Sequence, residues 1–205
     1  MLGAGGHARV LQEILAEQGI DLDGFLAPSP TGSTLGDVSW LGADEALAGL
    51  DPHNVLLVNG LGSASSPSLR RAAYVAAKDA GFAFRTVIDG TAIVKASALL
   101  GEGVQVLAGA IVGTRAVLRD DVLVNTGAIV DHDSVVGSHS HIATGAALAG
   151  SLVIGEETHI GLGARVIQGL TVGSGSTVGA GAVVIRSVPD SVTATGVPAS
   201  FGGAS

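Results

Sequence analysis

The sequence predicts an α/β domain of Rossmann-like type over residues 1–86, then an all-β parallel solenoid over residues 87–188, closed by a tail over residues 189–205. Residues 1–86 alternate between strand-like and helix-like stretches, which indicates an α/β domain. From Val87 a six-residue period takes over and continues for 17 repeats without an insertion. Aromatic residues are only 3% of the chain, and 32 of its 205 residues are glycine. The core must therefore consist of thin aliphatic layers.

The first domain is expected to have a β-α-β-β-α-β order. After a short first strand and a glycine turn, residues 7–17 suit a helix, and its apolar face would consist of Val10, Leu11, Ile14 and Leu15. Ser66 and Pro67 suit the cap and the first position of a second helix that runs to about residue 80. The other expected strands are residues 23–26, 55–58 and 84–87.

The turn after the first strand is a candidate phosphate site. Gly3, Gly5 and Ala8 match most of the dinucleotide fingerprint, a weak signal when it stands alone. Its glycines would let backbone N–H groups approach a phosphate at the N-terminus of a helix. The acidic residue expected about 20 positions later has two candidates, Asp21 and Asp23, and neither is decisive. The alternative is a tight strand–helix turn that binds nothing.

The six-residue period predicts a three-sided solenoid. The second position of every repeat is Val, Leu or Ile, and the sixth position is small or aliphatic. In a helix these residues would scatter around the cylinder, and a single flat strand would have no glycine-rich break every six residues. Short strands that alternate with turns, three to a coil, put the aliphatic residues inside. Glycine recurs at the third and fifth positions, where we expect it to relax the corners.

Four histidines lie close together in the repeats, and the 18-residue coil decides which of them stack. His141 and His159 are 18 residues apart and should lie one above the other, and His132 should lie one coil below Gly150. His132 stands between Asp131 and Asp133, and a neighbouring carboxylate makes an imidazole a better general base. For His139 and His159 the alternative is a polar residue without a catalytic role.

Composition excludes several classes of protein. Cysteine is absent, which excludes disulfide scaffolds, thiolate zinc sites and cysteine nucleophiles. The net charge is −8, which argues against nucleic acid as a partner because a grip on phosphates requires clustered cations. No apolar run reaches the ~18 residues of a membrane span, and no signal peptide is evident. We therefore expect a soluble cytoplasmic protein.

Four segments together resemble one bacterial family. They are residues 3–8 (GAGGHA), 125–133 (NTGAIVDHD), 137–142 (GSHSHI) and 196–199 (GVPA). This combination is similar to the nucleotide-sugar acetyltransferases of the sialic acid O-acetyltransferase and bacillosamine N-acetyltransferase type. The resemblance implies a hexapeptide-repeat, left-handed parallel β-helix, whereas the general rule for parallel crossovers would have given a right hand. It also implies a homotrimer that binds acetyl-CoA between subunits, a nucleotide-linked sugar in the N-terminal domain, and no metal.

The resemblance assigns roles to single residues. His132 matches the catalytic base and Asp133 its acidic partner, and Gly150 matches a glycine whose N–H faces the thioester oxygen. Direct transfer of the acetyl group to a 4-amino-sugar, for a surface glycan, is the activity that we expect. The residues that match the acetyl-CoA site are His141, Gly150, Leu162 and Ala180. Those expected at the nucleotide sugar are Gly5, Gly6, His7, Asn59, Gly62 and Ser63.

The sequence departs from the family pattern at two places. The acidic pair that often helps to bind uridine is replaced by Ala27 and Pro28. Ser200 stands where a basic residue often meets a coenzyme phosphate, so Arg165 or Arg186 would have to make that contact. The choice among UDP, GDP and CMP therefore stays open at this level.

Three other functions remain as alternatives. The first is O-acetylation of a sialic-acid-type sugar. The second is a γ-type carbonic anhydrase with zinc on His132, His141 and His159, which would leave the N-terminal domain without a purpose. The third is a nucleotide-sugar-binding protein without catalytic activity.

Overall fold

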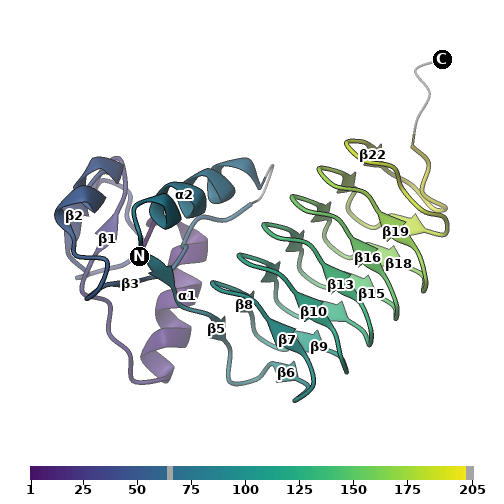
Figure 1. Cartoon of the computed structure of the whole chain (residues 1–205), viewed down its shortest axis with the longest axis horizontal. Coiled ribbons are helices and arrows are strands. Elements are labelled where there is room, and N and C mark those ends of the chain that lie inside the picture. The colour runs from purple at the N-terminus through teal and green to yellow at the C-terminus, as the bar shows by residue number, and fades with distance from the viewer. Residues whose placement is uncertain (64–66, 202–205) are drawn as a thin grey trace. The chain divides into compact units, whose positions relative to one another are not determined.

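The computed structural model describes residues 1–63 and 67–201, and the chain divides into two compact units, Met1–Val87 and Ile88–Ser205 (Figure 1). The first unit mixes helices with short parallel strands, and the second consists of stacked three-sided coils. In the described part of the chain, neither helix has the length and apolar character needed to cross a bilayer.

The first unit is built on a parallel sheet. Its strands pair as β1 with β2 and as β3 with β4, and Leu2 bridges both Leu26 and Asn59. The resulting order is β2, β1, the segment around Leu2, β3 and β4. The assignment of this unit to the Rossmann-like class stays a prediction. The elements are α1 (Gly6–Glu17), β1 (Phe25–Leu26), β2 (Trp40–Gly42), the 3₁₀ helix η1 (Asp44–Gly49), β3 (Leu56–Leu57), α2 (Ser68–Asp79) and β4 (Ala83–Phe84).

The predicted helices exist with small corrections. Leu11, Ile14 and Leu15 are buried on α1, but Val10 is 41% exposed, so its assignment to the apolar face was wrong. The second helix begins after Pro67, and the predicted cap Ser66 lies outside the described residues.

Strand boundaries differ more from prediction than helix boundaries. The predicted strand over residues 84–87 divides between β4 and β5, because the chain leaves one sheet after Phe84 and joins another at Val87. The structure adds β2 and η1, which the sequence did not predict. Both are short and neither has a buried residue, so they lack the apolar periodicity on which prediction depends.

Three parallel sheets form the sides of the second unit, and Figure 1 shows their coils stacked one after another. The first contains β5 (Val87–Ile88), β8 (Gln105–Val106), β11 (Leu123–Val124), β14 (His141–Ile142), β17 (His159–Ile160), β20 (Thr177–Val178) and β22 (Thr193–Ala194). The second contains β6 (Ile93–Val94), β9 (Ile111–Val112), β12 (Ile129–Val130), β15 (Ala147–Leu148), β18 (Arg165–Val166) and β21 (Val183–Val184). The third contains β7 (Leu99–Leu100), β10 (Val117–Leu118), β13 (Val135–Val136), β16 (Val153–Ile154) and β19 (Thr171–Val172).

The coil length is 18 residues, as the period predicts. Val117 pairs with Val135 and Val135 with Val153, and the same offset recurs on the other two faces. The second-position side chains are buried from Val106 to Val184 and form the core, with the earlier ones at Ile88, Val94 and Leu100 packed against it. The fold is the three-sided parallel β-helix that the repeat predicted, with the left hand that the family resemblance implied.

Glycine has two different roles in the coils. The fifth position of many repeats has positive φ, which glycine adopts freely, and Asp133 and His139 adopt it at 58° and 61°. At the third position the reason for glycine differs from the one predicted. A Cβ on Gly113 would lie 2.7 Å from the backbone nitrogen of His132 in the next coil, so glycine is required there by the close approach of coils and not by φ.

Candidate active site

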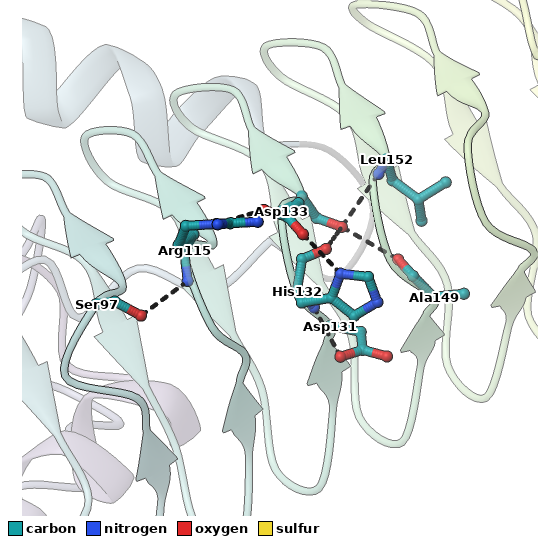
Figure 2. A network of polar contacts seen from close by, with 8 residues as sticks. Ser97, Arg115, Asp131, His132, Asp133, Ala149 and Leu152 are labelled. Atoms are coloured by element: carbon teal, nitrogen blue, oxygen red, sulfur yellow. Dashed lines mark hydrogen bonds and ion pairs between the residues drawn. The ribbon is translucent and has the colours of Figure 1, made fainter.

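His132 and Asp133 form a pair at the corner that follows β12. The ring atom Nδ1 lies 2.8 Å from Asp133 Oδ2, and the His132 side chain is 54% exposed (Figure 2). A carboxylate only accepts hydrogen bonds, so Nδ1 carries a proton and donates a hydrogen bond to Asp133. The lone pair is then on Nε2, the nitrogen that a general base would use.

Neighbouring polar groups fix the corner that carries this pair. Asp131 Oδ1 accepts the backbone N–H of His132 at 2.7 Å. The buried Ser134 hydroxyl donates to the carbonyl of Ala149 and accepts the N–H of Leu152, both at 3.1 Å, and so ties the corner to the next coil (Figure 2). The imidazole therefore projects from a backbone that is held on both sides.

Gly150 lies against the His132 ring, one coil further along, as the 18-residue spacing predicts. A Cβ on Gly150 would be 2.5 Å from both Cε1 and Nε2 of the ring. The space that the imidazole occupies thus depends on the absence of a side chain at residue 150.

A cation, the guanidinium of Arg115, reaches the pair from the preceding coil. The Nε and Nη2 atoms of Arg115 lie 2.7 and 2.6 Å from Asp133 Oδ1. The hydrogen bond from His132, and after it the one from Arg115, hold the pKa of Asp133 below its usual value. Arg115 was not predicted from the sequence, although its position 18 residues before Asp133 was a signal that could have found it.

His141 and His159 stack on the first sheet, as predicted. They pair in register on β14 and β17, and their ring centroids are 5.0 Å apart in an edge-on arrangement. The Nε2 atom of His141 lies 3.1 Å from Asn125 Nδ2, which donates to it. Burial lowers the pKa of His159. Its Nδ1 is buried without a hydrogen-bond partner in the described residues.

The remaining predicted residues of the solenoid occupy other corners. Leu162 and Ala180 are exposed and follow β17 and β20, whereas His132 and Gly150 follow β12 and β15. One protomer therefore carries His132 and Gly150 on one corner, and Leu162 and Ala180 on another. His139 pairs with the buried Asp121 at 3.1 Å, in keeping with its alternative as a polar residue outside the site.

The described residues contain no cluster of side chains that could bind a metal ion. Among residues 1–63 and 67–201, no group of three or more His, Asp or Glu side chains could hold a metal ion. His141 and His159 lie together, and His132 lies at a corner of another sheet.

The glycine turn leads directly into α1. Gly5 is the extended N-cap, Gly6 is the first helical residue, and a Cβ at either glycine would meet nothing within 4 Å. The hydroxyl of Thr34 donates to the carbonyl of Gly5 at 2.8 Å and fixes the turn from the opposite side. A Cβ on Gly62 would be 3.6 Å from Cβ of His7, so the structure brings these two predicted residues together.

A buried arginine holds the loop after β3. Arg70 of α2 is only 1% exposed, and its Nη1 donates to the carbonyls of Asn59 and Leu61 at 3.1 and 2.8 Å. Asn59 and Ser63 are buried as well, and the amide of Asn59 donates to the carbonyl of Arg70 at 3.1 Å. The contact of Asn59 and Ser63 with a nucleotide sugar stays a prediction, while Arg70 was missed. The spacing of Arg70 from Tyr74 and Ala77, the other buried residues of α2, was the available signal.

A left-handed parallel β-helix built from six-residue repeats is the fold of the hexapeptide-repeat acyltransferases. Comparison with known proteins gives the particular family. The family model of the PglD N-terminal domain matches residues 1–74. A histidine-to-alanine mutant of GDP-perosamine N-acetyltransferase from Caulobacter crescentus, in complex with CoA and GDP-perosamine, is 40% identical with a TM-score of 0.91, over 98% of this chain and 95% of that one.

Two further solved structures are similar. The acetyltransferase domain of PglB from Neisseria gonorrhoeae FA1090, in complex with acetyl coenzyme A, is 39% identical with a TM-score of 0.91, over 98% of this chain and 97% of that one. WeeI from Acinetobacter baumannii AYE shares the fold at 20% identity and a TM-score of 0.66, over 98% and 97% of the two chains. A sequence comparison with curated proteins finds no significant match. This chain belongs to the nucleotide-sugar N-acetyltransferases of the hexapeptide-repeat family.

Proposed function

We propose that this chain transfers the acetyl group of acetyl-CoA to the amine of a nucleotide-linked 4-amino-sugar, with His132 as general base. The geometry of His132 carries the proposal. Its Nδ1 is held by Asp133 at 2.8 Å and its side chain is half-exposed, so Nε2 is available to a substrate.

The chemistry requires two proton transfers and one exchange of bonds. The sugar amine attacks the thioester carbonyl, and the new C–N bond forms as Nε2 of His132 takes a proton from the nitrogen. Asp133 stabilises the imidazolium that results. The N–H of Gly150 stabilises the oxyanion, an effect often worth about 3 kcal/mol. The intermediate then collapses as the C–S bond breaks, and the coenzyme leaves as a thiolate that takes the proton from the His132 imidazolium, which restores the base.

A homotrimer would complete the site. His132 and Gly150 lie on one corner of the solenoid and Leu162 and Ala180 on another, so the two groups can meet only between protomers. Exposed aliphatic side chains support such a contact, because large apolar surfaces in solution favour association. They are Ile93, Leu99, Ile129 and Val153.

Acetyl-CoA would lie along the cleft between two solenoids. We propose that His141 faces the acetyl group and that Leu162 and Ala180 line the pantetheine arm. Arg186 is a candidate for a coenzyme phosphate, since Ser200 cannot supply the charge; its guanidinium lies 4.8 Å above the Phe201 ring. Arg165 is the other candidate. The cytoplasm supplies acetyl-CoA, and we propose that the reaction takes place there.

The nucleotide-linked sugar would occupy the first unit. Gly5 and Gly6 leave the N-terminus of α1 open to a diphosphate, and His7, Asn59, Gly62 and Ser63 lie at or beside the same turn. The C. crescentus relative is described with GDP-perosamine. A GDP-linked amino sugar is therefore the first acceptor to test.

A substrate panel tests this function. Purified protein is mixed with acetyl-CoA and UDP-, GDP- or CMP-linked amino sugars, and thiol release and product mass are measured. We expect turnover with one nucleotide class, and a 10²- to 10⁴-fold loss in His132→Ala. The matched control is His53→Ala, at an exposed histidine of the first unit. Binding without thiol release, or normal turnover in His132→Ala, would contradict the proposal.

A further inference from the structure

Arg115 is in direct contact with Asp133, and the mechanism above gives it no role. The Asp133 carboxylate divides its oxygens between two partners. Oδ1 accepts from Nε and Nη2 of Arg115 at 2.7 and 2.6 Å, and Oδ2 accepts from Nδ1 of His132 at 2.8 Å (Figure 2). With Oδ1 held from the preceding coil, rotation of the carboxylate is restricted and Oδ2 faces the ring.

The register of the β-helix places Arg115 there. Arg115 and Asp133 are 18 residues apart at equivalent corner positions, and their φ angles are 56° and 58°. Ser97 lies one coil earlier, and its hydroxyl accepts the backbone N–H of Arg115 at 3.1 Å (Figure 2). The ladder from Ser97 to Asp133 thus fixes the backbone from which the guanidinium extends.

We propose that Arg115 is a positioning residue of the transfer reaction, which orients Asp133 toward Nδ1 of His132 and limits how strongly that carboxylate attracts a proton onto the imidazole. This inference rests on the proposed function. Arg115 acts through Asp133 and is not required to touch either substrate.

Charge balance around the ring gives the expected effect. In the described part of the chain, the charged side chains in contact with His132 or with its partner are Asp131, Asp133 and Arg115, and the following coil contributes Gly150, which has no side chain. Without Arg115, the Asp133 carboxylate would face the imidazole with no cation to oppose it. It would stabilise the protonated form of the ring, which cannot act as a base.

The test uses pH profiles of kcat/KM for wild type, Arg115→Gln and Arg115→Lys, with Arg119→Gln as the control. Arg119 is an exposed arginine of the same coil, so its replacement makes the same change in net charge. In Arg115→Gln we expect the acidic limb to move up by about one pH unit and the activity below that limb to fall about tenfold. KM for both substrates should stay within about twofold. Arg115→Lys should keep the wild-type limb and lose part of kcat, because it retains the charge without the fork.

A second readout needs no turnover. NMR titration of the histidine ring signals should show the midpoint for His132 shifted upward in Arg115→Gln and unchanged in Arg119→Gln. An unmoved limb and an unmoved midpoint in Arg115→Gln would overturn the inference, and so would an equal shift in both variants. The proposed function fails separately, if wild type does not acetylate any member of the panel or if His132→Ala remains fully active.

Discussion

Replacement of Gly150 by alanine separates catalysis from stability at this site. A Cβ at residue 150 would lie 2.5 Å from Cε1 and Nε2 of His132, where ordinary contacts begin near 3.4 Å. The ring must therefore retreat by about 1 Å. A misplacement of that size costs about 10²-fold in rate. The backbone N–H of residue 150 remains, so the effect reports the position of the imidazole and not the loss of an oxyanion donor.

Stability should change little in the same variant. The atoms that must move are the far end of a half-exposed side chain, and φ of Gly150 is not in the positive range. Gly→Ala at a compatible backbone position lowers the entropy of the unfolded chain and contributes about 0.4–1 kcal/mol of stability. We expect an unchanged or slightly raised Tm together with a kcat that is about a hundredfold lower.

The assay is thiol release at saturating acetyl-CoA and acceptor, with Tm measured on the same samples. Gly90→Ala is the matched control, since a Cβ there would meet nothing within 4 Å. In a double variant with His132→Ala the added methyl group has no ring to displace, so Gly150→Ala should cost almost nothing further. A kcat within about twofold of wild type in Gly150→Ala, or fully additive losses in the double variant, would refute this reasoning.

Three further predictions concern other parts of the chain. Arg70→Met removes charged hydrogen bonds from the carbonyls of Asn59 and Leu61, so chemical denaturation should show a free energy of unfolding lower by about 2–3 kcal/mol. KM should rise for the nucleotide sugar but not for acetyl-CoA, and equal changes in the two KM values would contradict a role of Arg70 in the loop. Burial lowers the pKa of His159 below its ordinary value of 6.5, so the unfolded chain binds the proton more readily and stability is lost as pH falls from 6.5 toward the lowered value. The decrease in unfolding free energy between pH 7.5 and 5.5 should therefore be smaller in His159→Gln than in wild type. An identical decrease would show that His159 does not cause this pH dependence. Val153→Glu places a charge on a half-exposed aliphatic position. Light scattering should then show monomers in place of the proposed trimer, and activity should be lost. An intact trimer would show that the sheet face around Val153 is not part of the interface.

The repeat could be predicted from the sequence because its physics is local. Each six-residue unit places one aliphatic residue inside, and three units close a coil, so the core from Val106 to Val184 and the stacking of His141 on His159 follow from counting. The pair of His132 and Asp133 could also be predicted, since adjacent residues need no tertiary contact to meet.

The α/β unit was harder to predict at its edges. α1 and α2 have clear apolar periods, and both were predicted to within two residues of their bounds. β2 and η1 have no buried residue, so nothing in their composition distinguishes them from a loop.

The coil length, the inward residues and the histidine with a carboxylate neighbour follow from the order of residues, because each depends on spacing along the chain. Three contacts depend on the folded chain: Arg115 takes one oxygen of Asp133 and His132 the other, Gly150 leaves room for the imidazole, and Arg70 supports the loop at Asn59. These contacts depend on where long side chains come to rest between coils or between a helix and a loop. Spacing can bring two such residues near each other, but atomic packing decides which atoms meet.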